Sequence, residues 1–515
     1  MCTSSKPLSR TTGSSVHTSF KIGCGILTHP VIGSCDCPVL CDPLGADRYM
    51  LGRGSAWTGL RLASSGMPGW KKGALCLRRM VERSTVRLRQ LACHRAEEVK
   101  LGRLLRNDRV SLAALNRAAG ERVGERARGC RHVLAIHDTT ELNFQRHARR
   151  TQGLGPVGNG TDQGLFLHPL LAIEADGERC LGLAWAKLWV RRGKVTTGRR
   201  QRPMAQKESQ RWREGIAAAE QVLGAAALVT VVSDREADIY ESWAQPRPAH
   251  LHLLARAAQN RSVVGGTSLF AACDGLPIAL CYEFAVPRQP GRPARRAKME
   301  LRFGAVELRR PRWLRRAPRL QQATPDSVGL HLVDVRECGA RSSAEPPLHW
   351  RLLTTHAVDT PEAALQIVDW YRRRWNIEQL FWTLKRQGLD IEASQIESAE
   401  ALSKLAFLAT LAATRIMQLV RARGGATPTP AAEVFAADEI EALRLHQPGL
   451  EGRTAKQKNP HPADSLAWAS WIIARLGGWK GYASESPPGP ITMRHGLTRL
   501  EALCHARSML KSVHR

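Results

Sequence analysis

The segment "YRRRWNIEQLFWTLKRQG" (371–388) carries Tyr371, Arg374, Glu378 and Lys385 at successive spacings of three, four and seven residues. An α-helix turns by ~100° per residue, so these side chains would share an arc of roughly 60° on one continuous helix. An apolar face would lie beside them, formed by Trp370, Ile377, Leu380, Phe381 and Leu384. A carboxylate flanked by two cations and a phenol predicts a site for a metal ion and an anionic substrate.

Two further carboxylates each follow a short apolar run. "HVLAIHD" (132–138) ends in Asp138 and "ALVTVVSD" (227–234) ends in Asp234. Both runs are typical of buried strands, and sites in open α/β sheets form at the carboxyl ends of strands. Together with Glu378, the two aspartates could hold two divalent cations for an in-line phosphodiester displacement. Surrounding arginines and lysines would hold the nucleic-acid backbone.

Each carboxylate also has a structural explanation. Asp138 precedes "TT" and could open a turn, and Asp234 could cap the helix predicted for "READIYESW". Glu378 could pair with Arg374 or Lys385 on a solvated helix face. Only the combination of the three favours a catalytic site.

The order of predicted elements shows what would position these residues. Strands are predicted at 132–138, 165–175, 180–190, 227–234 and 250–256, the second and third forming a hairpin around "DGER". Helices are predicted at 205–224, at 235–243 and from Pro361 onward. Between residues 257 and 352 the sequence is arginine-rich and alternating, which indicates an inserted β subdomain.

The composition favours a polyanionic partner. The 515 residues hold 76 Lys plus Arg against 46 Asp plus Glu, a formal charge of +30. Neither a long apolar run nor the apolar core of a signal peptide is evident, so we expect a soluble intracellular protein and no membrane partner. The 13 cysteines are scattered, which predicts reduced thiols, and "CDCPVLC" (35–41) lacks the second pair of a zinc site.

Three segments then carry a resemblance to a known family. "HDTTELNF" (137–144), "SDREADIYE" (233–241) and "YRRRWNIEQLFWTLKRQG" resemble the catalytic segments of DDE transposases of the insertion-sequence-four type, cut-and-paste bacterial enzymes with a Tyr-x2-Arg-x3-Glu-x6-Lys signature. Further similar segments include "LGPVG" (154–158), "KESQRW" (207–212) and "LGGWKGYASESPPGP" (476–490). The family fold is an α/β, ribonuclease-H-like mixed sheet with helices, interrupted by a β insertion, which agrees with the predicted element order.

The resemblance implies roles for particular residues. Asp138, Asp234 and Glu378 would bind two Mg²⁺ ions, or Mn²⁺ in their place, and would be catalytic. DNA contacts are implied for Tyr371, Arg374, Lys385, Arg256 and Trp350, the last by stacking on a flipped base. A lone tryptophan that begins a strand can equally belong to the core, and Arg256 can equally form a salt bridge. Strand hydrolysis, hairpin formation and opening, and strand transfer into target DNA would follow one another.

The resemblance also predicts the organisation of the chain. The expected parts are an unassigned segment at 1–75 that is disordered or comes from a misassigned start, a helical DNA-binding region at 76–130, the first part of the catalytic domain at 131–256, the β-rich insertion at 257–352, the glutamate helix at 353–390 and a helical C-terminal region at 391–515. Partners would be double-stranded DNA, as transposon ends and target, and a second copy in a homodimer. The expected location is the bacterial cytoplasm, at the nucleoid.

Two other functions stay open from the sequence. An impaired transposase derivative could act as a DNA-binding inhibitor of transposition, which the atypical N-terminal segment would allow. A basic ribonuclease-H-like nuclease would use the same three carboxylates but gives no account of Tyr371, Arg374 and Lys385 beside Glu378.

Overall fold

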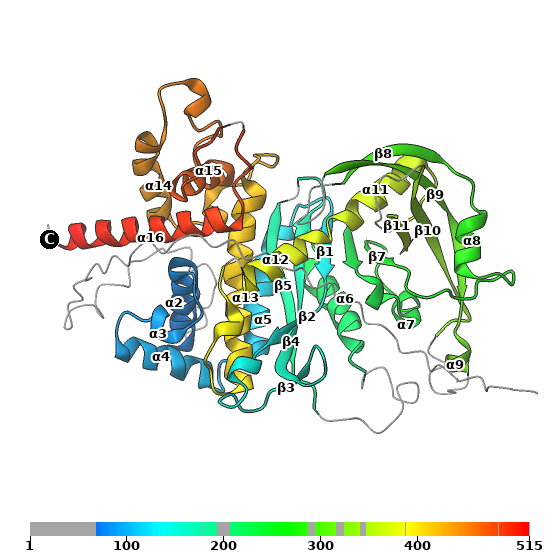
Figure 1. The fold of residues 1–515 in the computed structure, drawn as a ribbon, viewed down its shortest axis with the longest axis horizontal. Coiled ribbons are helices and arrows are strands. Elements are labelled where there is room, and N and C mark those ends of the chain that lie inside the picture. The colour runs from blue at the N-terminus through cyan, green and yellow to red at the C-terminus, as the bar shows by residue number, and fades with distance from the viewer. Residues whose placement is uncertain are drawn as a thin grey trace, which may run out of the picture.

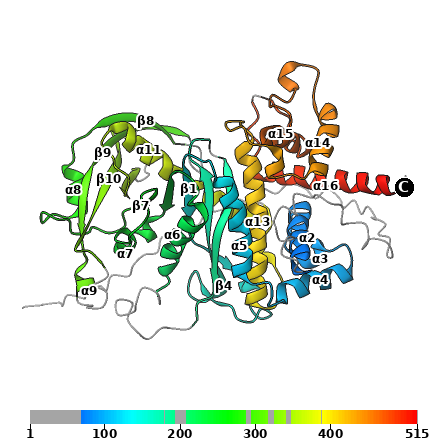
Figure 2. The same cartoon turned by 180° about the vertical axis from the view of Figure 1, so that it is seen from behind.

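The computed structural model of the chain describes residues 68–177, 179–192, 207–286, 294–315, 324–339, 347–386, 388–482 and 484–513. In these ranges a large mixed sheet is flanked by helical N- and C-terminal regions (Figure 1, Figure 2). Cys35, Cys37 and Cys41 and most of the segment 1–75 lie outside the described residues. The eight cysteines within them carry free thiols, as predicted.

Helices precede the sheet in the chain. They are α2 (Pro68–Arg83), α3 (Leu88–Leu91), α4 (Arg95–Arg106) and α5 (Leu112–Ala127). The boundary predicted at residue 76 falls inside α2, which begins at Pro68. Proline suits the first turn of a helix, because the backbone N–H that it lacks would have no partner there. Ser111 caps α5, since its Oγ accepts a hydrogen bond from the backbone N–H of Ala114 at 3.2 Å.

Three parallel strands form the centre of the sheet. They are β1 (Val133–His137), β6 (Val229–Ser233) and β7 (Leu251–Arg256). Every residue of β1 and of β6 is buried, which explains why both strands read as continuous apolar runs. Both strands were predicted at nearly these positions.

Antiparallel strands extend the sheet beyond β1. β4 (Asp162–Glu174) pairs with β1 and forms the predicted hairpin with β5 (Cys180–Trp189). Two short strands that the sequence did not reveal, β2 (Thr140–Asn143) and β3 (Gly155–Val157), also pair with β4. The long β4 therefore supports the segment that directly follows Asp138.

The segment predicted as an inserted β subdomain continues this same sheet. Its strands are β8 (Leu280–Val286), β9 (Arg295–Arg309), β10 (Ser327–Cys338) and β11 (His349–Thr354), with the short helices α8 (Leu269–Gly275) and α9 (Arg312–Arg315). β11 pairs antiparallel with β7, so the strand order is β2-β4-β1-β6-β7-β11-β10-β9-β8. The segment is β-rich as predicted, but hydrogen bonds join it to the central strands.

Helices cover both faces of the central strands (Figure 1, Figure 2). On β1, Val133 and Ala135 pack in one core with Trp212 of α6 (Gln210–Leu223). Leu134 and Ile136 pack in the other core, which includes the helices that follow β11. This alternation along the strand shows that each face of β1 has its own apolar layer.

The helix predicted from Pro361 through Lys385 is two helices, α11 (Pro361–Arg372) and α12 (Trp375–Lys385). Arg373 lies at the break, where its Nε donates to Asp369 at 3.0 Å and its Nη1 donates to the carbonyl oxygen of Ala175, after the end of β4. The predicted single helix is therefore interrupted at Arg373 and Arg374, although both residues keep right-handed helical backbone angles.

The helix predicted for residues 235–243 is also interrupted. It consists of a 3-10 turn, η4 (Arg235–Ala237), and one turn of α-helix, α7 (Tyr240–Trp243). Asp238 separates them, and its buried carboxylate accepts hydrogen bonds from Trp243 Nε1 at 3.2 Å and from the backbone N–H of Ala258 at 2.9 Å. The helix is therefore interrupted at Asp238, whose side chain accepts hydrogen bonds from residues further along the chain.

The long helix α13 (Ala399–Ala422) lies between the sheet on one side and, on the other, α2–α4 and the helices that follow it in the chain, in both views (Figure 1, Figure 2). It is followed by α14 (Ala437–Leu450), α15 (Leu466–Leu476) and α16 (Pro490–Val513). The helix is long and apolar enough to cross a membrane, but 83% of its most apolar 18-residue stretch is buried inside the fold. A central core helix accounts for that composition.

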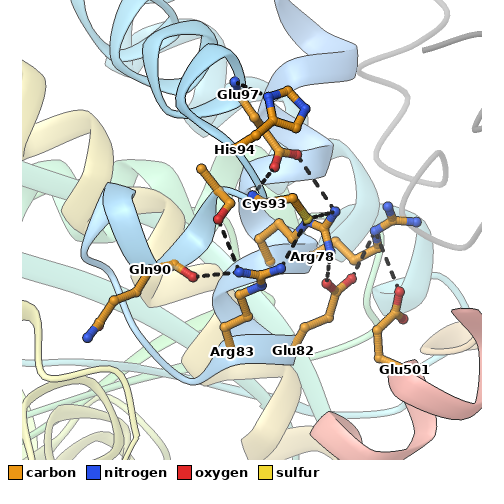
Figure 3. Close-up of polar contacts among 10 residues, drawn as sticks. Arg78, Glu82, Arg83, Gln90, Cys93, His94, Glu97 and Glu501 are labelled. Carbon is orange, nitrogen blue, oxygen red and sulfur yellow. Dashed lines mark hydrogen bonds and ion pairs between the residues drawn. The ribbon is translucent and has the colours of Figure 1, made fainter. Parts of the chain in front are cut away.

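Ion pairs connect α2 with α16, although they are more than four hundred residues apart in the chain (Figure 3). Arg78 lies 2.9 Å from Glu82 and 4.0 Å from Glu501. Burial, reinforced by the neighbouring Glu82, raises the pKa of Glu501 to about 8. The N-terminal helices are thus held against the C-terminal region.

Candidate active site

The register of β1 and β6 brings the two predicted aspartates together. His137 pairs with Ser233 in this parallel ladder, so the next residues, Asp138 and Asp234, leave the sheet from neighbouring strand ends. Adjacent strands are separated by about 4.8 Å. The prediction that both carboxylates lie at one edge is therefore fulfilled by backbone pairing.

Glu378 reaches the same edge through an arginine. Arg374 Nη1 lies 2.7 Å from Asp138 Oδ2, and Arg374 Nη2 lies 2.7 Å from Glu378 Oε1. The side chain of Arg374 is 12% exposed, that of Asp138 is 18% exposed and that of Glu378 is 37% exposed. One largely buried guanidinium thus bridges two of the three predicted carboxylates.

The three carboxylates act on one another electrostatically. Burial raises the pKa of Asp138 to about 7, against the lowering effect of Arg374, and both Asp234 and Glu378 add to the rise. Burial likewise raises the pKa of Glu378, and Asp234 contributes. Burial alone would lower the pKa of Arg374, but Asp138, Tyr371 and Glu378 raise it overall. The site therefore holds more negative charge than its one bridging arginine compensates.

The structural alternatives are fulfilled only in part. Asp138 does accept a hydrogen bond from the backbone N–H of Thr139 at 2.7 Å, as a turn residue would. Glu378 does pair with Arg374, four residues earlier. Asp234 precedes η4 but its side chain makes no capping hydrogen bond there. Its carboxylate therefore has no structural partner of the predicted kind.

Tyr371 and Lys385 lie on separate helices, at the end of α11 and the end of α12. Tyr371 is 6% exposed, and burial raises the pKa of its phenol. Lys385 Nζ lies 3.8 Å from Glu392, and burial lowers the pKa of its ammonium group. Tyr371 stays beside Arg374, whereas the closest acidic partner of Lys385 is Glu392 and not Glu378.

Arg256 and Trp350 meet where β7 joins β11. Arg256 Nη2 donates to the carbonyl oxygen of His349 at 2.8 Å, which is a structural contact. The ring of half-buried Trp350 lies 6.3 Å from the ring of Tyr371 and makes an edge contact with Phe284 at 5.8 Å. Trp350, on β11 of the β-rich segment, therefore lies close to the end of α11.

The chemistry of these donors fits a hard divalent cation, since all three supply carboxylate oxygens and their mutual repulsion favours a bound cation. The side chains are not gathered around a single point, however. Within the ranges that the structure describes, no group of three or more His, Cys, Asp or Glu side chains is arranged to hold a metal ion. The positive charge between Asp138 and Glu378 is that of Arg374, which donates a hydrogen bond to each carboxylate.

A buried hydrogen-bond network beneath the aspartates was not predicted. His137 Nε2 lies 2.6 Å from Ser233 Oγ, and His137 Nδ1 lies 3.2 Å from His168 Nε2. His168 Nδ1 in turn lies 2.8 Å from the hydroxyl of Thr139. Burial lowers the pKa of His137 to about 3, and burial also lowers that of His168. Neutral imidazoles thus connect the residues next to Asp138 and Asp234.

Arg211 of α6 completes this network. Its Nε donates to Thr139 Oγ1 at 2.7 Å, and its Nη2 donates to Glu236 Oε2 at 2.6 Å. One arginine therefore braces the turn after Asp138 and the turn after Asp234. Polar residues inside an otherwise apolar strand are the only sequence signal for such a network, because a buried polar group needs a partner.

A glycine allows α6 to approach this network. A Cβ atom at Gly215 would lie 2.4 Å from His137 Nδ1, which is closer than real Cβ contacts. Only glycine therefore fits where α6 packs against the end of β1.

Comparison with known proteins agrees with this geometry in part. Residues 184–415 match the family described as "Transposase DDE domain", which is less than half of the chain. The matched residues include Asp234 and Glu378, while Asp138 precedes them. A solved cryo-EM structure of a piggyBac transposase synaptic complex with hairpin DNA is 9% identical, has a TM-score of 0.35 and aligns over 88% of this chain and 77% of that chain. That likeness is too low to assign a shared fold. Residues 184–415 are thus similar to a transposase DDE domain, and this match supports a DDE transposase.

Proposed function

We propose that this protein is a metal-dependent DNA transposase that cleaves strands at transposon ends and transfers them into target DNA. The observation that carries the proposal is the register of β1 and β6, which brings Asp138 beside Asp234. The salt bridges of Arg374 add Glu378 to the same edge. The match of residues 184–415 to the transposase DDE domain family supports the same chemistry.

In this proposal Asp138, Asp234 and Glu378 hold two Mg²⁺ ions, or Mn²⁺ in their place. When bound, such ions activate an attacking oxygen and stabilise a leaving oxygen of a phosphodiester. Arg374 neutralises Asp138 and Glu378 in the protein alone, and its guanidinium is free to turn to a DNA phosphate once a cation replaces it. Burial of the edge strengthens each of these electrostatic interactions.

The remaining site residues would grip DNA. Tyr371 and Arg374 lie together at the break between α11 and α12, where a phenol and a guanidinium can donate to one phosphate. Trp350 lies near Tyr371 and offers a stacking surface for an unpaired base. We assign Lys385 and Arg256 to backbone contacts at the rim, in addition to their contacts with Glu392 and His349.

The wider features of the proposal follow the same resemblance. The mixed sheet, with a β-rich segment between β7 and α11, supports a ribonuclease-H-like catalytic domain. The helices before β1 would contribute to DNA binding, and a second copy of the chain would bind the second transposon end. The net charge of +30 favours DNA as the partner and the nucleoid as the location.

The experiment that tests this function is cleavage of a DNA fragment carrying the flanking ends of the gene. The full chain and Glu378→Gln are each assayed with Mg²⁺ and with EDTA, and DNA binding is measured in parallel. We expect Mg²⁺-dependent nicks at the ends from the wild type, and none from Glu378→Gln despite equal DNA binding.

Glu362→Gln is the matched control, since Glu362 is an exposed glutamate of α11. It should cleave like the wild type. End-specific binding by the wild type without nicks would favour the inhibitor of transposition instead. Unchanged cleavage by Glu378→Gln would remove this residue from the mechanism.

A further inference from the structure

A cavity of about 80 Å³ lies where α2, α5, β5 and α13 meet, and none of the carboxylates proposed for catalysis lines it. Its polar lining consists of Arg122 and Arg126 of α5, Thr414, Arg415 and Gln418 of α13, and Glu433. Apolar residues such as Leu77 of α2 close the rest of the wall. Three arginines and one glutamate therefore face a small, partly open cavity.

Two of these arginines share their acidic partners with the surrounding structure. Arg126 Nη1 donates to the carbonyl oxygen of Leu181 at 2.6 Å, and its Nε lies 3.9 Å from Glu433. Glu433 also pairs with Arg179 at 2.9 Å, so its charge is divided between two arginines. Arg415 lies 3.0 Å from Glu439. Glu433 and Glu439 are thus already paired with other arginines, which leaves little negative charge near the cavity to compensate the third arginine.

Arg122 is the third arginine, and among the described residues it forms neither a hydrogen bond nor an ion pair. It precedes Arg126 by four residues on α5, a spacing at which like charges repel. Burial, together with the charges of Arg126 and Arg415, lowers the pKa of Arg122 to about 10 against the opposing effect of Glu125. The fold therefore holds an uncompensated guanidinium beside two others.

We propose that this cavity binds a small tetrahedral oxyanion of the phosphate class, held by Arg122 and Arg126. A single buried water needs roughly 10–15 Å³ of such space, so a cavity of about 80 Å³ holds a group of several atoms. Guanidinium forks match the oxygen pairs of phosphate, and the anion would replace repulsion between the arginines with two attractive contacts. The anion would lie between α5 and α13, opposite Thr414 and Arg415 of α13.

The test compares the full-length wild type with Arg122→Gln and with Arg117→Gln. Arg117 is exposed on the same helix and serves as the matched control for loss of one positive charge. Inorganic phosphate binding is measured by titration calorimetry, and the midpoint of thermal unfolding is measured with phosphate or chloride at equal ionic strength. Saturating phosphate should raise the midpoint of the wild type and of Arg117→Gln by about 2–4 °C.

Arg122→Gln should lose the phosphate response and should unfold at a higher temperature than the wild type in chloride, because the repulsion is gone. This reversal separates a ligand site from a merely structural arginine, whose removal lowers the midpoint in both buffers. Arg122→Lys keeps a charge without the fork, so phosphate should bind it at least about tenfold more weakly than the wild type. A phosphate response of Arg122→Gln equal to that of the wild type overturns the proposal.

The source of the phosphate group is resolved by adding a mononucleotide in place of inorganic phosphate. A free anion fits the small volume of the cavity better than a whole nucleotide does, so binding that depends on Arg122 should be stronger for inorganic phosphate. A preference for the mononucleotide, lost in Arg122→Gln, would assign the site to a phosphate ester. Absence of wild-type binding to both overturns the site.

Discussion

The sheet edge and the cavity beneath α2 are opposite in charge. At the edge, three carboxylates surround one bridging arginine, Arg374. In the cavity, three arginines and only one glutamate, Glu433, form the charged part of the lining. Both arrangements place like charges together in partly buried surroundings, where Coulomb repulsion is poorly screened. Each therefore lowers stability in the isolated protein and favours a ligand of the opposite charge.

The two regions differ in how their excess charge can be reduced when no ligand is bound. At the edge, Asp138 has a pKa of about 7 and can take up a proton near neutral pH. In the cavity, the pKa of Arg122 falls only to about 10, so this arginine stays charged. The carboxylate edge can thus lower its negative charge by binding a proton. The positive charge of the arginine cavity can be compensated only by a bound anion.

The largest effect should come from Asp138→Asn, which removes a charge at the sheet edge. The one carbonyl oxygen of asparagine can still accept the hydrogen bond from the backbone N–H of Thr139, so the turn should persist, whereas the second oxygen, which accepts from Arg374, is lost. Loss of a carboxylate ligand should slow Mg²⁺-dependent cleavage by on the order of 10³-fold or more. Strand cleavage and DNA binding by the purified full chain measure the two effects separately.

Asp359→Asn provides the control, since Asp359 is an exposed aspartate between β11 and α11. Its cleavage rate should equal that of the wild type. Cleavage by Asp138→Asn within about tenfold of the wild type would contradict the comparison, because the edge would then work without its excess charge.

The same variant should change how stability depends on pH. The folded protein binds the Asp138 proton with a pKa of about 7, against an ordinary value of 3.8. Because the folded state then holds this proton more tightly, the free energy of unfolding contributed by Asp138 falls between about pH 4 and pH 7 and is lost above that range. Asp138→Asn lacks this loss, so its stability relative to the wild type should rise by about 4 kcal/mol across the window.

Urea unfolding in EDTA, at pH values from 4.5 to 8, is the measurement (about six buffers suffice to resolve the slope). The test rests on how the difference in free energy of unfolding between the two proteins changes with pH. A difference that is the same at every pH can come from altered packing around asparagine. Added Mg²⁺ at pH 8 should stabilise the wild type more than the variant. A constant difference between the two proteins would show that Asp138 titrates normally.

A positional effect should follow from Arg211→Met, which leaves every carboxylate in place. Arg211 holds Thr139 and Glu236, the neighbours of the two aspartates, so its loss should misplace both. Partners that orient metal ligands typically affect activity by about 10–100-fold, and we expect a loss of that size in cleavage. Arg211→Lys should recover part of it, since one donor remains.

Arg213→Met on the same helix is the matched control, since Arg213 contacts Gln245 away from the aspartates. Cleavage is measured across a series of Mg²⁺ concentrations. A positioning role predicts that Arg211→Met needs more Mg²⁺ for half-maximal cleavage. An unchanged Mg²⁺ dependence would limit Arg211 to a role in stability.

The sequence predicts the edge site better than the cavity, and the reason is distance along the chain. β1 and β6 are short apolar runs buried on both faces, so their ends mark Asp138 and Asp234 directly. Glu378 follows from a local helical spacing. By contrast, Arg122 and Arg415 come from helices almost three hundred residues apart, and no local pattern connects them.

Tertiary contacts also explain the incorrect predictions. At the break after α11, Arg373 donates to the carbonyl oxygen of Ala175, a distant contact that local helix propensity does not reveal. The pairing of β11 with β7 joins the β-rich segment to the central sheet through backbone hydrogen bonds that any strand sequence can make. The network of His137, His168 and Arg211 likewise depends on how α6 packs.

The smallest effect should come from a balanced pair, which sets the baseline for both charged regions. Arg296 of β9 lies 2.7 Å from Glu283 of β8, and their side chains are 81% and 53% exposed. Water and salt screen such a pair, so the coupling energy between them should be only about 0.2–1 kcal/mol. A double-mutant cycle of Glu283→Gln and Arg296→Gln, followed by urea unfolding, measures it. Neither Mg²⁺ nor phosphate should change the result, because opposite charges here already compensate each other. A ligand response as large as at Asp138 or Arg122 would mean that charge excess is not what distinguishes the two sites.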